Sequence, residues 1–256
     1  MKTVIIVAGA CRFTEIAHKS WNIFPDADWY LSTWDITQKP YSSEAWSSIE
    51  EINSIRHKFK YINISNYKNE YLETSLAATL RPFMLLEKIL KIIKDEKYER
   101  VIYFRPDLVL FKMNQESWPN LTQMSLDEFN EDDFDIDDTT IKVADCHGPD
   151  NWLSHDRREI QDSFMVFSWN SFVKFVDGAI HITSNLGIHH SLYEFFDSNK
   201  IIMKPLLPIR VVILRNNIVN NLNKKSWYQL TELFGEEYKQ KDHLGKFAKQ
   251  IDLKEL

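Results

Sequence analysis

The chain has 256 residues, of which 44% are apolar and 13% aromatic, and its net charge is −6 at pH 7. This length fits one large domain with a substantial core, and the negative charge disfavours a protein that coats DNA or RNA without specificity. The two cysteines, Cys11 and Cys146, exclude a disulfide framework, and no apolar run approaches transmembrane length, so we expect a soluble protein of the reducing cytoplasm.

The first hundred residues alternate strand-like and helix-like patterns. Strands are predicted at Thr3 to Ala8, Trp29 to Ser32, Lys58 to Ile64 and Arg100 to Phe104. Helices are predicted at Phe13 to Phe24, Ser43 to Arg56 and Leu72 to Lys94. Within the last helix, Pro82 marks a break or a new first turn. This alternation predicts an α/β fold with parallel βαβ units and an open sheet covered on both faces.

The second half of the chain is less regular. Residues 112–140 form a polar connection that includes eight carboxylates between Asp127 and Asp138, and we expect a solvated, partly mobile loop. Further strands are predicted at Ile141 to Ala144, Ser163 to Ser168 and Leu206 to Leu214. Further helices are predicted at Asn170 to Ile182, Leu186 to Phe196 and, as a polar tail, Trp227 to Phe247.

The most informative segment is Arg105-Pro106-Asp107, which follows the apolar strand Val101 to Phe104. A carboxylate at the end of a buried strand is a common way to hold a metal ion or a diphosphate at the carboxyl edge of an α/β sheet. The alternative is a proline turn with a solvated aspartate. The segment resembles the acidic metal-binding motif of nucleotide-sugar-dependent glycosyltransferases of the GT-A type, one branch of which has Arg-Pro-Asp in place of Asp-X-Asp.

Two further segments extend the resemblance to the binding of the donor. Gly9, at the exit of the first strand, allows the backbone to approach a ligand, and Thr33-Trp34-Asp35 ends the second strand. The resemblance implies donor-binding roles for Ala8, Gly9, Arg12, Trp34, Asp35 and Arg81. The structural alternatives are a tight strand-to-helix turn, packing of Trp34, capping of a loop by Asp35 and a surface position for Arg81.

The resemblance also implies a cation and a catalytic base. Asp107 would bind Mn²⁺ or Mg²⁺ across the donor diphosphate, with His190 as a second ligand unless it packs or caps its helix. Because arginine replaces the first aspartate, the cation would be loosely held or dispensable, and Arg105 would neutralise phosphate. Asp162 is the candidate base for the acceptor hydroxyl, or else a turn residue or an orienting group. His147 and Trp152 would line the acceptor pocket.

By resemblance, residues 1–256 form a single Rossmann-like GT-A domain. It would comprise a nucleotide-sugar-binding half (1–111), an acceptor-side half (141–225) and a helical tail (226–256). The expected activity is transfer of a sugar from a nucleotide-diphosphate sugar to a hydroxyl. The composition, rich in Lys, Asn and Ile, suggests a bacterial or bacteriophage genome. Its acidity favours a surface glycan as acceptor over a hydroxymethylated base of phage DNA. The alternative of another class is a non-catalytic nucleotide- or sugar-binding protein.

Overall fold

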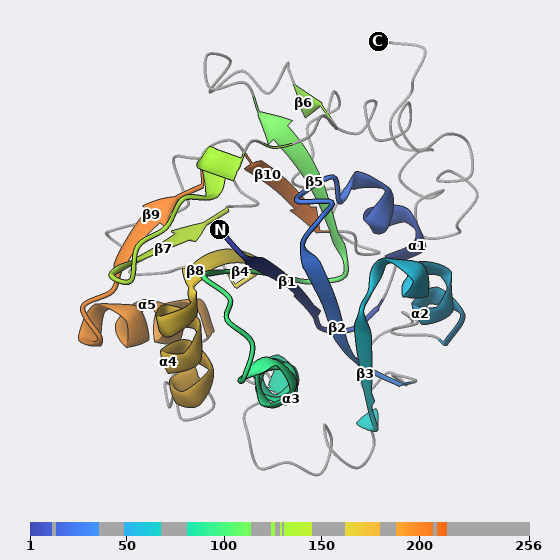
Figure 1. The fold of residues 1–256 in the computed structure, drawn as a ribbon, viewed down its shortest axis with the longest axis horizontal. Coiled ribbons are helices and arrows are strands. Elements are labelled where there is room, and N and C mark those ends of the chain that lie inside the picture. Colours follow the sequence, from blue (N-terminus) through green and yellow to red (C-terminus); the bar gives the residue numbers. More distant parts are fainter. Residues whose placement is uncertain are drawn as a thin grey trace.

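A mixed, mostly parallel sheet of seven strands is the framework of the protein (Figure 1). The computed structural model describes residues 1–11, 14–35, 49–67, 81–113, 124–125, 129, 131–144, 162–179, 188–206 and 209–213. The strands, in their order across the sheet, are β3 (Tyr61–Ser65), β2 (Asp28–Trp34), β1 (Thr3–Ala8), β4 (Arg100–Phe104), β8 (Phe164–Ser168), β7 (Thr140–Val143) and β9 (Ile202–Pro205). β8 is antiparallel to both of its neighbours, whereas the other pairs are parallel.

A second, antiparallel sheet has three strands, β10 (Ile209–Ile213), β5 (Leu108–Met113) and β6 (Met124–Ser125). β5 follows β4 directly, so the chain leaves the large sheet and enters the small one across the three residues Arg105, Pro106 and Asp107. This turn is therefore the junction of the two sheets.

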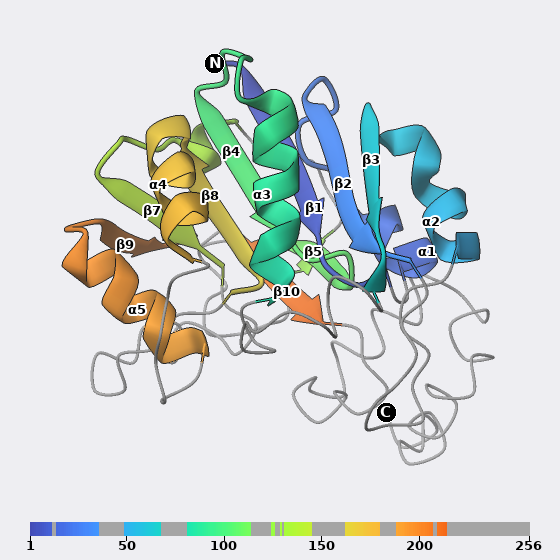
Figure 2. The same ribbon diagram turned by 90° about the horizontal axis from the view of Figure 1, so that it is seen from below.

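Both faces of the large sheet are covered, and each carries its own apolar core. α3 (Arg81–Ile93), α4 (Trp169–Ala179) and α5 (Ile188–Ser198) cover one face (Figure 2). α1 (Thr14–Ala17), α2 (Ile49–Ile55) and the small sheet cover the other. Because strand side chains alternate between faces, β1 contributes alternate residues to the two cores and is buried throughout. No helix among the described residues is long and apolar enough to cross a membrane.

The structure confirms the α/β class and most of the expected strands. β1 and β4 have the predicted bounds, and Pro82 is the second residue of α3, where a proline begins a helix without loss of a hydrogen bond. The helix expected from Phe13 to Phe24 is shorter, because only α1 and the 3-10 turn His18–Ser20 form there. β9, which contains Lys204 and Pro205, was not predicted. The tail helix expected at Trp227 to Phe247 lies outside the described residues.

The acidic segment is anchored more firmly than its composition predicts. Phe134, in the 3-10 turn Glu131–Phe134, is fully buried and packs edge-on against Phe24, with ring centroids 4.9 Å apart. The buried Arg100 donates to the carbonyl of Glu131 (3.3 Å) and to Asp135 Oδ1 (3.3 Å). Most of the described carboxylates in this segment are exposed, as expected. The expectation of a solvated, partly mobile loop overlooks the buried contacts, because charge counting gives no weight to one phenylalanine.

We predict that Phe134→Ala lowers the free energy of unfolding by about 3–5 kcal/mol, because it leaves a cavity in the core beneath the acidic segment. Urea denaturation monitored by circular dichroism measures this loss. Asp132→Ala, in the same turn but exposed, is the matched control and should change stability little. Equal stability of the two variants would show that Phe134 does not anchor the segment.

Candidate functional site

The candidate site lies at the carboxyl edge of the large sheet, where β1, β2, β3 and β4 all end. β8 runs in the opposite direction, and its first residue, Phe164, pairs with Phe104 at the end of β4. The backbone N–H of Arg105 consequently donates to the carbonyl of Ser163 over 3.1 Å. Segments far apart in the sequence, the exits of β1 and β4 and the approach to β8, thus meet at this edge.

Gly9 allows the exits of β1 and β4 to touch. Its φ is +139°, and its N–H donates to the carbonyl of Ser32 over 3.1 Å. A Cβ at this position would lie only 3.1 Å from Cδ of Pro106. Glycine is therefore required both for the backbone conformation and for the close approach of the neighbouring turn.

Arg105 and Asp107 form a bidentate ion pair within this turn. Arg105 Nε donates to Asp107 Oδ1 over 3.0 Å, and Nη2 donates to Oδ2 over 2.8 Å. The Asp107 side chain is 1% exposed, whereas that of Arg105 is 18% exposed. The cation of the pair therefore reaches the surface, and the carboxylate lies beneath it.

Electrostatic effects tie a third group, Asp162, to this pair. Burial by itself would lower the pKa of Arg105, but the charges of Asp107 and Asp162 outweigh burial and raise the pKa above its ordinary value. Burial, followed by the charge of Asp162, raises the pKa of the neighbouring Tyr103. Asp162 is half-buried, directly before Ser163. A charged guanidinium and two carboxylates thus share the carboxyl edge.

Cys11, which follows the Gly9 turn, is not a reactive thiol. Its side chain is fully buried, and burial raises its pKa to about 12. Because the thiolate is the reactive form, a thiol that stays protonated at neutral pH is a poor nucleophile.

The structure buries Trp34 and engages Asp35 in the next loop. Trp34 is 2% exposed and packs edge-on against Tyr67, with ring centroids 6.2 Å apart. Asp35 accepts from the backbone N–H of Tyr67 (2.8 Å) and from Asn66 Nδ2 (3.1 Å). These contacts agree with the structural alternatives, which are packing of Trp34 and capping of a loop by Asp35. The ring of Trp34 offers no open face to a base in this conformation. The donor-binding roles of the two residues stay predictions.

The other predicted site residues divide between the edge and segments outside the described part. Ala8 is the buried last residue of β1, and the first turn of α3, which begins at Arg81, lies at the carboxyl edge (Figure 2). His190, in the first turn of α5, pairs with Glu194 over 3.3 Å. The positions outside the described residues are Arg12, His147 and Trp152.

The described residues do not fit the expected divalent cation. Both oxygens of Asp107 accept from Arg105, so a cation at Asp107 would compete with the guanidinium for a buried carboxylate. Nor does the described part of the chain contain a group of three or more His, Cys, Asp and Glu side chains that could hold a metal ion.

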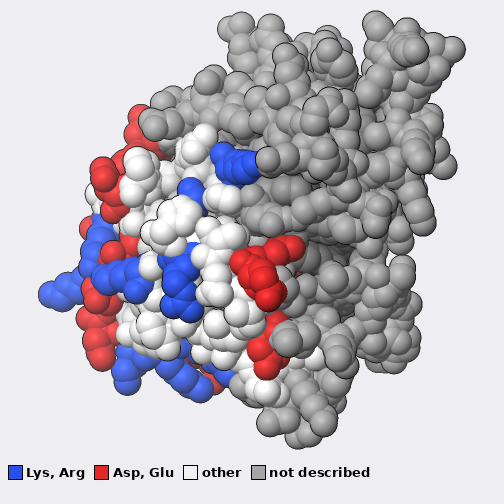
Figure 3. Space-filling view, turned by 90° about the vertical axis from the view of Figure 1, so that its right-hand side faces the viewer, with Lys and Arg blue, Asp and Glu red and all other residues white. Residues whose placement is uncertain are grey.

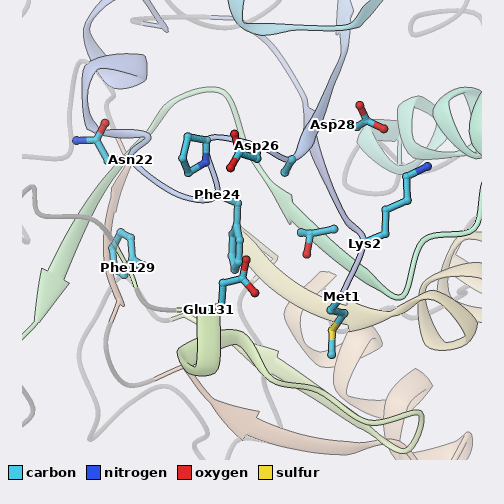
Figure 4. A pocket seen from close by; sticks show the side chains of 11 residues that line it. Met1, Lys2, Asn22, Phe24, Asp26, Asp28, Phe129 and Glu131 are labelled. Atoms are coloured by element: carbon cyan, nitrogen blue, oxygen red, sulfur yellow. The ribbon is translucent and has the colours of Figure 1, made fainter.

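Sequence reasoning missed a pocket of about 340 Å³ at the opposite, amino edge of the sheet (Figure 4). Its lining includes Lys2 before β1, Phe24 and Asp28. Tyr98 and Lys60 already occupy one oxygen of Asp28, at 2.6 Å and 3.1 Å. Lys2 is likewise paired, with Glu96. Lys2 and Asp28 therefore already pair with residues of the protein itself. Ligands of open α/β sheets bind instead at the carboxyl edge.

No protein-family model matches the chain, and a search of curated proteins finds none that is similar in sequence. Any functional assignment must therefore come from the geometry of the site.

We predict that Gly9→Ala destabilises the fold by about 1–3 kcal/mol, because alanine strains the positive φ and crowds Pro106. The free energies of unfolding of Gly9→Ala, Pro106→Ala and the double variant separate the two causes. If crowding contributes, part of the loss is recovered in the double variant, so the two effects are not additive. A stability of Gly9→Ala equal to that of the wild type would contradict the observed contact.

We also predict a pH-dependent effect of Tyr98→Phe. Burial would raise the pKa of Asp28, but the hydrogen bonds from Tyr98 and Lys60 outweigh it and lower the pKa below its ordinary value of 3.8. The Tyr98 contact therefore stabilises the fold above that pH, by about 1 kcal/mol, and the stabilisation is lost as the pH falls through the lowered pKa.

Thermal unfolding of the wild type and of Tyr98→Phe between pH 7 and pH 3 tests this prediction. The difference in stability should shrink in the acidic half of the range. Tyr61→Phe, which removes an exposed hydroxyl, is the control and should show no such trend. A difference that stays constant with pH would show that Tyr98 does not stabilise the ionised form of Asp28.

Proposed function

We propose that this protein is a GT-A-type glycosyltransferase, which moves a sugar from a nucleotide-diphosphate sugar to an acceptor hydroxyl. One observation carries the proposal. From β1, the strand order leads to β2 and β3 on one side and to β4 on the other, so β1 and β4 flank the point at which the order reverses. Ligands of open α/β sheets bind at such a point, and here it holds Gly9 and the Arg105–Asp107 pair.

The chemistry of these groups suits a phosphorylated donor. Gly9 lets the turn that carries Arg105 lie against the exit of β1, and the guanidinium of Arg105 forms the strongly directed hydrogen bonds that phosphate oxygens accept. Stabilising the negative charge that develops on the departing diphosphate would lower the barrier to transfer. Arg105 is thus proposed to act on the leaving group.

Asp162 is proposed as the base that takes the proton of the acceptor hydroxyl. It is half-buried and directly precedes Ser163, whose carbonyl accepts from the backbone N–H of Arg105 over 3.1 Å, so it lies close to the proposed position of the diphosphate. A carboxylate in hydrogen-bond reach of the acceptor can accept a proton in the transition state.

A glycan is favoured as the acceptor over a hydroxymethylated base in phage DNA. The chain carries a net charge of −6, and binding to a duplex depends on contacts between basic residues and phosphates. On the face shown in Figure 3, Lys and Arg side chains alternate with Asp and Glu over the described residues, without a broad basic surface there. Binding of a glycan does not require a broad basic surface.

The first experiment is thermal unfolding with a panel of nucleotide-diphosphate sugars, since a ligand that binds only the folded protein raises the melting temperature. We expect at least one member to do so. Turnover of that donor is then measured by release of free nucleoside diphosphate, with bacterial surface oligosaccharides and hydroxymethylated duplexes as acceptors. The absence of stabilisation by every donor would overturn the proposed function, and transfer to the duplex would reverse the preferred acceptor.

We predict that Asp162→Asn lowers kcat by about 10²–10⁴-fold while the affinity for the donor is retained, because the amide cannot accept the proton. Asp177→Asn, an exposed position on α4, is the matched control. Full turnover in Asp162→Asn would remove this residue from the reaction. If the wild type binds a donor and turns over none of the acceptors, the alternative of a non-catalytic nucleotide- or sugar-binding protein is supported instead.

A further inference from the structure

We propose that Arg105, held in position by Asp107, binds the diphosphate of the donor in place of a divalent cation, so that this site works without metal. The inference rests on the proposed function and adds to it the means by which phosphate is recognised. It assigns Asp107 the role of a positioning residue that acts through Arg105, instead of the role of a metal ligand.

Asp107 is already engaged by Arg105. Its two oxygens accept from Nε and Nη2 of Arg105 at 3.0 Å and 2.8 Å, and its side chain is 1% exposed. A cation would have to compete with these two hydrogen bonds and enter a buried position. It would then lie beside a guanidinium that stays charged, and the two positive charges would repel each other.

The pair is oriented with its guanidinium toward solvent. A ligand that approaches from solvent meets Arg105, which is 18% exposed, before it meets Asp107. A guanidinium has five N–H donors in a planar fork, and Asp107 uses two of them. The three others suit the geometry of phosphate oxygens, for which a planar fork is better matched than a point charge.

Hydrogen bonds and packing fix the turn before any ligand binds. The backbone N–H of Arg105 donates to Ser163, the N–H of Leu108 donates back to the carbonyl of Arg105 over 3.3 Å, and Pro106 is in close contact with Gly9. A group that is already fixed loses little conformational entropy on binding. The bidentate contact from Asp107 completes this preorganisation by fixing the guanidinium itself.

The decisive experiment uses the wild-type protein and needs no variant. Isothermal titration calorimetry with UDP, GDP, CDP, ADP and dTDP is carried out once in excess EDTA and once in Mn²⁺. We expect at least one nucleoside diphosphate to bind in EDTA, with an affinity within about threefold of that in Mn²⁺. Binding that occurs only with Mn²⁺ would overturn the metal-free site and leave the proposed glycosyltransferase intact. No binding in either buffer would overturn both.

Variants then test the roles of the two residues. Arg105→Lys keeps the charge but loses the fork, and we expect the affinity for the diphosphate to fall at least about tenfold. Asp107→Asn keeps the size and releases one of the two hydrogen bonds, and we expect an intermediate loss. The control is Arg56→Gln, an exposed arginine near the start of β3 at the amino edge, which should bind as the wild type does.

A further measurement distinguishes a positioning role of Asp107 from a role as metal ligand, even if Asp107→Asn is less stable than the wild type. Titration of Mn²⁺ into the wild type and into Asp107→Asn is followed by the paramagnetic relaxation of water protons. We expect the two proteins to be indistinguishable, with no Mn²⁺ site that depends on Asp107. Loss of a bound Mn²⁺ in the variant would show that Asp107 is a metal ligand and would overturn the proposal.

Discussion

β1 and β4 are neighbouring strands that are both fully buried, and the rest of the structure depends on this constraint. The two strands are paired in parallel and are covered on both faces, so their ends cannot move apart without exposing core residues. Gly9 and Pro106, which follow them, are consequently in contact. Everything proposed for the site follows from this forced proximity of two turns that are almost a hundred positions apart in the sequence.

The ion pair between Arg105 and Asp107 links this constraint to the proposed function. A buried carboxylate without a partner is costly, and the bidentate guanidinium supplies that partner at the point where the chain passes from the large sheet to the small one. The same contact that makes the burial of Asp107 tolerable also fixes the orientation of Arg105. The structural requirement and the proposed function therefore depend on the same turn.

The two edges of the large sheet differ in how their charges are used. At the amino edge, ion pairs such as Lys2–Glu96, Lys60–Asp28 and Arg100–Asp135 join loops and strand starts to one another. At the carboxyl edge, the charged groups Arg105, Asp107 and Asp162 stand at the reversal of strand order. The first set joins neighbouring segments of the fold, and the second lies at the proposed ligand site.

The sequence by itself determined the elements whose signal is local: the apolar strands β1 and β4, the new first helical turn at Pro82, which is the second residue of α3, and the position of Gly9 at a strand end. Only the tertiary structure decided which side chains are paired or buried. Spacing alone cannot show that Asp107 is paired with Arg105, that Trp34 is buried or that Phe134 enters the core, because each outcome depends on neighbours distant in sequence or on burial. Strand periodicity is a property of a few consecutive residues, whereas burial is a property of the whole assembled sheet.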